Sequence, residues 1–323
     1  MFSRILVPLD GSPFAEAAFP VAIAIAERVG GEIHLLSVRP HLWSDEAAPL
    51  ERALDQEAWA YLGDAATRLR ASTSVPVSCD MTRGDVVEEI VEEAEASHDL
   101  IVMTSHGRGG LSRIWLGSVT DACLRSTKKP LLVVRPPHGG ETTTGQSPTA
   151  FRLDRVVVPL DGSTLSESAL PTAVALADAF GVPLLLVRSV LAPVPLDTAP
   201  FPAPDWVPVD PRELIAGATA ELERVAAVVQ TAHGRPTTHV DIGRHPALAI
   251  GDAAGIGGMV VMAAHPHGEL RRAFLGSVSD KVVRTADGPV LVLKPPQVGD
   301  APESRWGRGA ARVTERKRRT VEA

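Results

Sequence analysis

The chain repeats itself over a period as long as a whole domain. The segment ILVPLDGS at residues 5–12 returns as VVVPLDGS at residues 156–163, which is 151 residues later. Near the end of each half, WLGSVTDA at 115–122 is matched by FLGSVSDK at 274–281, at an interval of 159 residues. Stacked-repeat proteins have periods of about 20 to 50 residues, so this period indicates duplication of a complete folding unit.

Within each half, short apolar segments alternate with helical ones. The apolar segments are rich in β-branched residues with few polar positions, which is typical of parallel strands covered on both faces. Strands are predicted at 4–9, 32–38, 75–79, 99–103, 130–135, 155–160, 184–188, 237–241, 258–263 and 289–294. First-half helices are predicted at 13–29, 50–71, 85–97 and 118–127. This alternation predicts an α/β fold with a doubly wound parallel sheet in each half.

The composition supports two domains with a core each. Hydrophobic residues make up 45% of the 323 residues, and the length suits two domains of about 150 residues. We predict a first domain at 1–136, a linker rich in Gly, Thr, Ser and Pro at 137–152, and a second domain at 153–296. The remaining residues, 297–323, are predicted to form a disordered basic tail.

Charge and hydropathy exclude two classes of partner. The net charge is −7, and the tail from residue 301 carries seven basic and three acidic residues, so the first 300 residues are near −11. Such acidity argues against nucleic acid. No apolar run approaches the ~20 residues of a membrane span, and the start has no signal-peptide pattern. We therefore predict a cytoplasmic protein without a membrane partner. Cys79 and Cys123 are predicted to be buried and reduced.

Ligands in open parallel sheets bind beyond the carboxyl ends of the strands, where the strand order reverses. Asp10-Gly11-Ser12 follows the first strand, and a glycine-rich loop follows the fourth strand at Thr104. If these strands are neighbours, both segments face one crevice. Exposed loop amides and a helix beginning at Ser118 suit phosphate, whereas the carboxylate of Asp10 suits the hydroxyls or amine of a nucleoside.

A simpler interpretation of the same residues is helix capping. Ser118-x-x-Asp121 and Ser277-x-x-Asp280 both fit a capping box, in which the serine caps its helix and binds nothing. Asp121 would also disfavour a nearby anion, and no Walker loop is present. The residues alone leave phosphate binding and helix capping both open.

Three motifs together, VPLDGS, GRGGLSRIWLGS and KPLLVV, resemble the universal stress protein family over residues 4–135 and 155–294. Nucleotide-binding members of that family carry a strand-one Asp and a G-x2-G-x9-G-[ST] loop. Here Gly107 is followed by nine residues and then Gly117-Ser118, while Thr104 replaces the first glycine. The resemblance implies two tandem Rossmann-like domains, each with five parallel strands in the order 3-2-1-4-5, and ATP as the ligand.

The resemblance also implies roles for single residues. Asp10 would hold the adenosine end, and Val38 and Met103 would flank the adenine. The side chain of Thr104 narrows the backbone approach that a glycine would permit. The residues implied to bind ATP, with or without Mg²⁺, are Pro8, Leu9, Asp10, Ser12, Val38, Met103, Thr104, His106, Gly107, Arg108, Gly117, Ser118, Val119 and Thr120.

The second half keeps less of the motif. The retained counterparts are Asp161, Gly276 and Ser277. Pro266 occupies the position of Gly107, and Ala263 that of Thr104. Because proline has no N–H to direct at a phosphate, we predict weak or no nucleotide binding in this half.

The leading functional hypothesis is therefore a nucleotide-binding stress-response module and not an enzyme. No catalytic residue or metal site is predicted: His265 and His267 lack an acidic partner, and Glu92 and Glu93 are interpreted as a solvated helix face. One alternative is a slow ATPase in which Asp10 or His106 positions water. Another is an interaction protein that binds no nucleotide.

The edges of the two fifth strands provide a further prediction. An unpaired edge is a template for pairing, so the fifth strands are expected to pair between the halves, as an internal pseudo-dimer, or between chains, as a homodimer.

Overall fold

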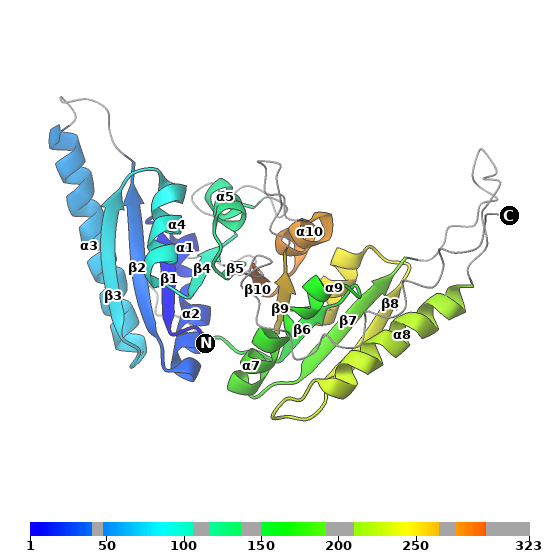
Figure 1. The fold of residues 1–323 in the computed structure, drawn as a ribbon. Helices are drawn as coiled ribbons and strands as arrows, with labels where there is room; N and C mark the ends of the chain where they lie inside the picture. Colours follow the sequence, from blue (N-terminus) through cyan, green and yellow to red (C-terminus); the bar gives the residue numbers. More distant parts are fainter. Residues whose placement is uncertain (41–47, 106–115, 137–149, 192–209, 265–275, 295–323) are drawn as a thin grey trace, which may run out of the picture.

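The computed structural model describes residues 1–40, 48–105, 116–136, 150–191, 210–264 and 276–294. These residues form an α/β fold around a ten-stranded sheet, whose order is β3-β2-β1-β4-β5-β10-β9-β6-β7-β8 (Figure 1). Each half therefore has the predicted strand order 3-2-1-4-5. Among the helices of these ranges, none combines the length and the apolar character that a membrane crossing requires.

The first half alternates strands and helices as its sequence predicts. Its strands are β1 (Arg4–Leu9), β2 (Glu32–Arg39), β3 (Val77–Arg83), β4 (Leu100–Thr104) and β5 (Leu131–Val134). Its helices are α1 (Pro13–Glu16), α2 (Phe19–Val29), α3 (Ala48–Ser72), α4 (Val86–Ser97) and α5 (Ser118–Ser126). All pairings within this half are parallel.

The second half repeats this order. Its strands are β6 (Arg155–Pro159), β7 (Leu184–Val190), β8 (Thr237–Ile242), β9 (Gly258–Ala263) and β10 (Val290–Leu293). Its helices are α6 (Thr164–Glu167), α7 (Leu170–Phe180), α8 (Pro211–Val228), α9 (Pro246–Ala254) and α10 (Ser277–Thr285). The pairings within this half are again parallel.

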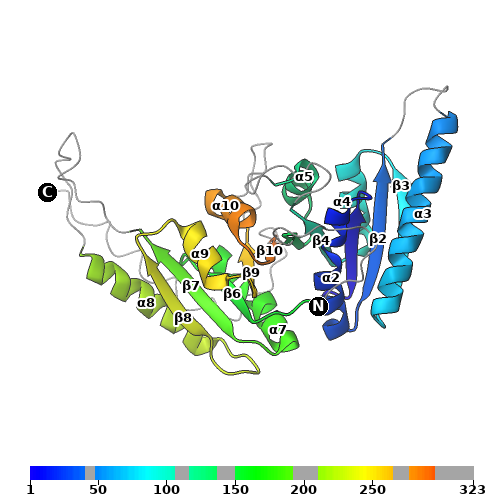
Figure 2. The same cartoon turned by 180° about the vertical axis from the view of Figure 1, so that it is seen from behind.

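The two halves share one sheet because β5 pairs antiparallel with β10. Val133, Leu132 and Leu131 lie opposite Val290, Leu291 and Val292. Figures 1 and 2 show this junction near the middle of the molecule. The strand-five edges that the sequence marks as templates thus pair with each other inside the chain.

Hydrophobic cores cover both faces of the sheet and continue from one half to the other. Helices α2, α3, α7 and α8 bury their apolar residues on one face, with Ile25 and Leu222 among them. Helices α4, α5, α9 and α10 do so on the other face, with Ile90 and Val283 among them. This two-sided burial explains the nearly continuous apolar sequence of the inner strands.

The helix predicted at 13–29 is divided in the structure. α1 ends at Glu16 and α2 begins at Phe19, with Pro20 in the first turn of α2. Proline lacks an N–H and its ring clashes with the carbonyl four residues earlier, so it is tolerated in a first turn but not inside a helix. Pro171 divides α6 from α7 in the same way.

The strand predicted at 75–79 was misplaced, because β3 runs from Val77 to Arg83. β3 is an end strand of the sheet, and the side chains of Ser78 and Asp80 are exposed. A strand at the end of a sheet, with one face exposed, alternates polar and apolar residues. The prediction was based on continuous apolar segments and therefore misplaced this strand.

Candidate functional site

The predicted site lies where the strand order reverses, at the carboxyl ends of the adjacent strands β1 and β4. Ile5 lies opposite Leu100, and Leu6 opposite Ile101, in parallel register. The carboxyl ends of both strands therefore meet at one edge of the sheet. The expectation that the first and fourth strands are neighbours is confirmed.

The turn after β1 holds its own shape through backbone and side-chain contacts. Gly11 has φ of 81°, a left-handed conformation that favours glycine. The Asp10 carboxylate accepts a hydrogen bond from the Ser12 amide at 2.9 Å. The Ser12 hydroxyl caps α1 by accepting from the Ala15 amide at 3.3 Å, and the Ser12 side chain is buried. Ser12 thus stabilises the start of α1, whereas Asp10 is exposed at the edge of the crevice.

An ion pair that the sequence analysis missed lies under this turn. Glu16 of α1 and Arg68 of α3 are 2.8 Å apart, with side chains only 9% and 15% exposed. Burial, and then the charge of Glu16, raise the pKa of the Tyr61 hydroxyl, so Tyr61 stays neutral. The sequence could have revealed this ion pair, because an equivalent pair occurs in the second half, where Glu167 and Arg224 lie 3.2 Å apart.

Apolar residues flank the ends of the strands on the face that α4 and α5 cover. Met103 belongs to the core cluster on that face, and Val38 packs against it. Pro8 follows Leu6 by two residues and so shares its face, because side chains alternate along a strand. Leu9 belongs to the core of the opposite face. The structure therefore places Val38 and Met103, the residues expected to flank the adenine, on one face of the sheet together with Pro8, and places Leu9 on the opposite face.

The start of α5 is fastened to the end of β4. The Gly117 amide donates to the Ser105 carbonyl at 2.7 Å. The Thr120 hydroxyl, which is buried, donates to the Thr104 carbonyl at 2.9 Å. Gly117 and Thr120 are among the residues that the resemblance implies bind ATP, and these two donor groups are used within the protein.

The capping-box interpretation of this helix is wrong. Gly117 is the N-cap of α5 and makes no side-chain cap, so Ser118 is the first helical residue. α10 is the same, with Gly276 as N-cap and Ser277 inside the helix. In a capping box the serine is the N-cap, which precedes the first helical residue, and the acidic residue is the third helical residue. Here each serine is itself the first helical residue and each aspartate is the fourth, so neither occupies its capping-box position.

The amides of Ser118, Val119 and Thr120 precede the first bonded amide of α5, that of Asp121. Asp121 itself forms ion pairs with Arg125 at 2.9 Å and with Arg284 of α10 at 3.3 Å. These pairs offset the negative charge that the sequence analysis counted against an anion here. The first turn of α5 is therefore suited to an anion by its amides and by the helix dipole.

The sequence profile of the Universal stress protein family matches residues 1–135 and 152–294. This chain belongs to the universal stress protein family. A universal stress protein of Mycobacterium bovis is 26% identical over 321 residues, covering 91% of this chain and 95% of that protein. One from Methanocaldococcus jannaschii is 32% identical over 143 residues, covering 42% of this chain and 84% of that protein.

A solved structure shares the fold over both halves of the chain. A universal stress protein from Archaeoglobus fulgidus has a crystal structure that aligns with a TM-score of 0.64 and 21% sequence identity. The alignment covers 91% of this chain and 99% of that one, so the likeness in fold extends through both halves.

Part of the site expected for a universal stress protein lies outside the described residues. His106, Gly107 and Arg108 are in this group, and so is Pro266 of the second half. The described part of the crevice consists of the turn at Asp10, the apolar wall, Thr104 and the start of α5.

The second half of this universal stress protein differs at its equivalent turn. The Asp161 carboxylate accepts from both the amide and the hydroxyl of Ser163, at 2.9 and 2.6 Å. Burial by itself raises the pKa of Asp161, but the hydrogen bonds from Ser163 outweigh burial and lower that pKa. Ser163 of the same loop thus holds the Asp161 carboxylate in place.

An ion pair also crowds the second turn. Arg188 of β7 pairs with Glu221 of α8, and a Cβ placed on Gly162 would clash with a Glu221 carboxylate oxygen. By strand register, Arg188 takes the position that Ser37 holds in the first half. Gly276 and Ser277 are exposed, and Ala263 is half-buried.

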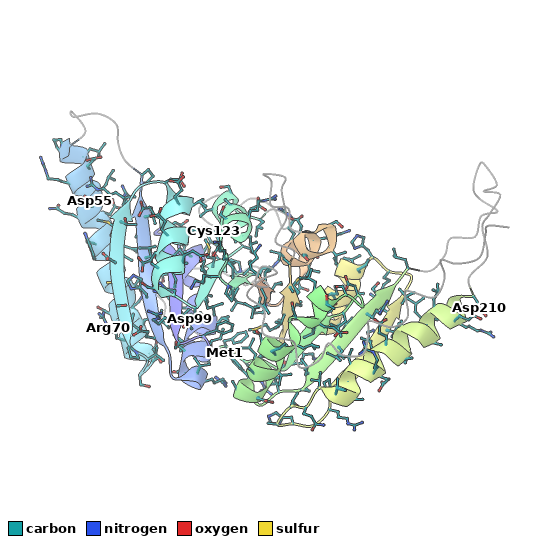
Figure 3. All side chains as sticks on the ribbon, viewed as in Figure 1. Met1, Asp55, Arg70, Asp99, Cys123 and Asp210 are labelled. Atoms are coloured by element: carbon teal, nitrogen blue, oxygen red, sulfur yellow. The ribbon has the colours of Figure 1, made fainter. Side chains whose placement is uncertain are left out.

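The prediction that both cysteines are buried is correct for Cys123 and wrong for Cys79. Both are free, and Cys123 (labelled in Figure 3) is buried, while Cys79 is only half-buried. Burial, together with the charge of Asp85, raises the pKa of the Cys123 thiol to about 12. The thiol therefore stays protonated at neutral pH.

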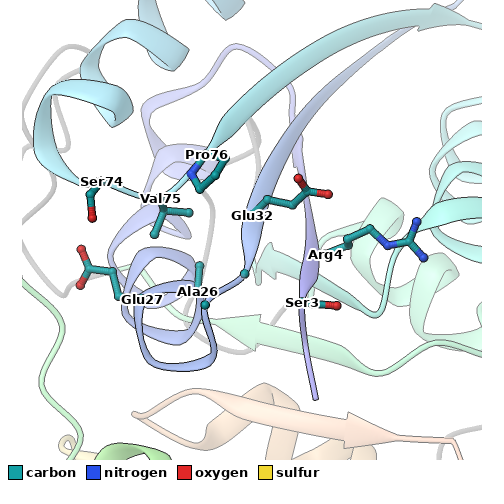
Figure 4. A pocket seen from close by; sticks show the side chains of 10 residues that line it. Ser3, Arg4, Ala26, Glu27, Glu32, Ser74, Val75 and Pro76 are labelled. Carbon is teal, nitrogen blue, oxygen red and sulfur yellow. The ribbon is translucent and has the colours of Figure 1, made fainter.

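A pocket of about 620 Å³ lies at the opposite edge of the sheet, between the starts of β1 and β2 and the end of α2 (Figure 4). Arg4, Gly31 and Val75 are among its lining residues. It contains none of the predicted nucleotide-binding residues and is open, so it is a surface groove separate from the switch-point crevice.

Proposed function

We propose that this protein is a nucleotide-binding universal stress protein that holds ATP in the crevice of its first half. The observation that carries the proposal is the adjacency of the β1 and β4 ends, with the first turn of α5 fastened beside them. Asp10 would bind the adenosine end, and Pro8, Val38 and Met103 would contact the base. The amides of Ser118, Val119 and Thr120 would bind phosphate.

The first turn of α5 has backbone amides that can bind the phosphates of such a ligand. α5 begins at a glycine with no side-chain cap, so no side chain of its own competes for its first amides. The Gly117 amide and the Thr120 hydroxyl fix this turn against β4 and are not counted among the phosphate donors. Mg²⁺, when bound with ATP, would supply charge neutralisation of the phosphates.

In the second half, we propose a structural role in place of nucleotide binding. The Asp161 carboxylate is engaged by Ser163, and the pair of Arg188 and Glu221 crowds Gly162. With β5 and β10 paired, this half acts as the partner of the first half in an internal pseudo-dimer. The protein as a whole is proposed to be a cytoplasmic binding module without catalytic turnover.

The matched glycines at the two helix starts provide the test. Gly117→Trp and Gly276→Trp place the same bulky side chain at the N-cap of α5 and of α10, where the backbone φ is −57° and −54°. A Cβ on Gly276 meets open space, so its variant should fold normally. Equilibrium dialysis of labelled ATP should show at least tenfold weaker binding for Gly117→Trp and unchanged binding for Gly276→Trp.

Circular dichroism of both variants verifies that each is folded before its affinity is compared. Equal ATP affinity in all three proteins would remove the first-half crevice from consideration, and loss only in Gly276→Trp would move the site to the second half. Phosphate release that persists through purification and disappears in Asp10→Ala would contradict the absence of turnover.

A further inference from the structure

Two histidines and a glutamate come together at the edge of the sheet opposite the nucleotide crevice. They are His34 of β2, Glu93 of α4 and His98, which is the C-cap of α4. One ligand atom of each side chain lies within 4.8 Å of the corresponding atoms of the other two. His34 is near the start of β2 and His98 just precedes β4, which places the cluster at the amino-terminal edge of the sheet.

Hydrogen bonds orient both imidazole rings. His98 is 6% exposed, and its Nδ1 lies 3.0 Å from the Glu93 carbonyl oxygen. A carbonyl only accepts, so Nδ1 donates and neutral His98 keeps its lone pair on Nε2. Nδ1 of His34 lies 2.9 Å from the Ser78 hydroxyl. Ligating histidines in metal sites are characteristically held by a second hydrogen bond of this kind.

We propose that His34, Glu93 and His98 form a binding site for a divalent transition-metal ion, with Zn²⁺ as the best match. Imidazole nitrogens favour zinc and its neighbours over Mg²⁺ or Ca²⁺, and two His plus one Glu leave a fourth position for water. Tetrahedral zinc needs ligand atoms about 3.4 Å apart. The ligand atoms now lie within 4.8 Å of one another, so zinc binding requires them to move closer, and the side chains of His34 and Glu93 are only half-buried.

The charge around the cluster favours a cation. The carboxylates whose charges act on His34 are those of Glu93, Asp80 of β3 and Glu32. A bound cation would offset this negative charge.

The second half shows that the fold itself does not require these donors. Strand register places Leu185 at the position of His34 and Gly257 at that of His98. Aligned from their N-caps, α4 and α9 place Ala253 at the position of Glu93. All three donors are therefore particular to the first half. A metal ion there would join β2 to the end of α4 and stabilise this half of the molecule.

Zinc titration of the metal-free full-length protein tests this site. Isothermal titration calorimetry should show that the wild type binds one more Zn²⁺ ion tightly per protein molecule than His34→Gln or Glu93→Gln does. Loss of an outer partner of a zinc ligand weakens affinity by about 10- to 100-fold, so loss of a ligand should weaken it by at least ~100-fold. His239→Gln, which removes an exposed histidine of β8, is the matched control and should bind as the wild type does.

Melting temperatures provide a second measurement that is independent of the heat signal. Zn²⁺ should raise the melting temperature of the wild type and of His239→Gln, and leave that of His34→Gln and Glu93→Gln unchanged. Without metal, Glu93→Gln should melt near the wild type because its side chain is half-exposed. Equal zinc stoichiometry and affinity in all four proteins, or no binding to the wild type below millimolar Zn²⁺, would overturn the proposal and leave a packed histidine pair.

Discussion

At the scale of single residues, Asp99 shows how one carboxylate fixes a terminus. It lies just before β4 and accepts hydrogen bonds from the Ser3 hydroxyl at 2.7 Å and from the amides of Ser3 and Arg4 at 3.1 Å each. Burial by itself raises the pKa of Asp99, but these hydrogen bonds outweigh burial and lower it below its ordinary value (Figure 3 labels the residue). The ionised form is therefore the one that secures the start of β1.

Replacing this carboxylate should make stability depend on pH in a defined direction. A group whose pKa is lowered by folding stabilises the protein above its unfolded pKa of about 3.9, and the contribution is lost as the pH falls through the folded pKa. We expect Asp99→Asn to lower the free energy of unfolding by about 1 kcal/mol at pH 7, and the difference from the wild type to shrink as the pH falls below the unfolded pKa. Urea denaturation between pH 3 and 7 measures this difference.

Glu57→Gln is the control for this experiment, because Glu57 is an exposed residue of α3. Its difference from the wild type should be small at every pH. A difference for Asp99→Asn that stays constant down to pH 3 would show that the carboxylate charge is not what stabilises the N-terminus.

At the scale of elements, glycine stabilises the end of one helix and destabilises the interior of another. Gly30 ends α2 in a left-handed conformation with φ of 66°, and its amide bonds the Ala26 carbonyl. Gly181 ends α7 in the same way, with φ of 70°. Gly63 instead lies inside α3, where a glycine lowers helix stability. A Cβ on Gly30 or Gly63 would meet no other atom within 4 Å, so backbone conformation alone should decide the effect of a substitution.

Alanine should therefore change stability with opposite sign at these two positions. Gly30→Ala forces a left-handed alanine and should lower the free energy of unfolding by about 1–2 kcal/mol. Gly63→Ala should raise it by about 0.5–1 kcal/mol. Urea denaturation at pH 7 compares the two variants, which serve as controls for each other. The same sign in both variants would contradict this conformational argument.

At the scale of the whole molecule, the two halves are joined by more than a strand pair. Arg284 of α10 bonds both Asp280 of its own helix, at 2.8 Å, and Asp121 of α5, at 3.3 Å. On the other face, Arg28 of α2 lies 4.3 Å from the ring centre of Phe180 in α7. Because these contacts and both cores cross the junction, the halves should be energetically coupled.

A double-mutant cycle can measure this coupling. Arg284→Gln should lower the free energy of unfolding by about 1–2 kcal/mol, since the guanidinium is partly buried and contacts two carboxylates. Asp121→Asn combined with Arg284→Gln should be less destabilising than the sum of the single changes, by at least ~0.5 kcal/mol. Arg152→Gln removes an ion pair whose arginine is 90% exposed and should change stability little. Strict additivity would show that the Asp121–Arg284 contact does not couple the halves.

The candidate site was predictable from the sequence where neighbouring residues determine it, and missed elsewhere. The turn at Asp10 and the start of α5 were located by motif, yet the capping role of Ser118 was wrong, because one residue decides whether a serine lies before or inside a helix. Glu93 was interpreted as part of a solvated helix face, although it lies beside His98. Its other neighbour, His34, is distant in the sequence, so no local pattern could reveal the cluster.

The sequence by itself determined the duplicated unit and its alternation of strands and helices, because these follow from periodicity within short segments. The strand order in each half was implied by the resemblance to the universal stress protein family. Tertiary structure decided that the two units merge into one sheet through β5 and β10. It also paired Glu16 with Arg68 and gathered His34, Glu93 and His98. Those contacts join segments more than fifty residues apart, and only the packing of helices on a twisted parallel sheet brings such segments together.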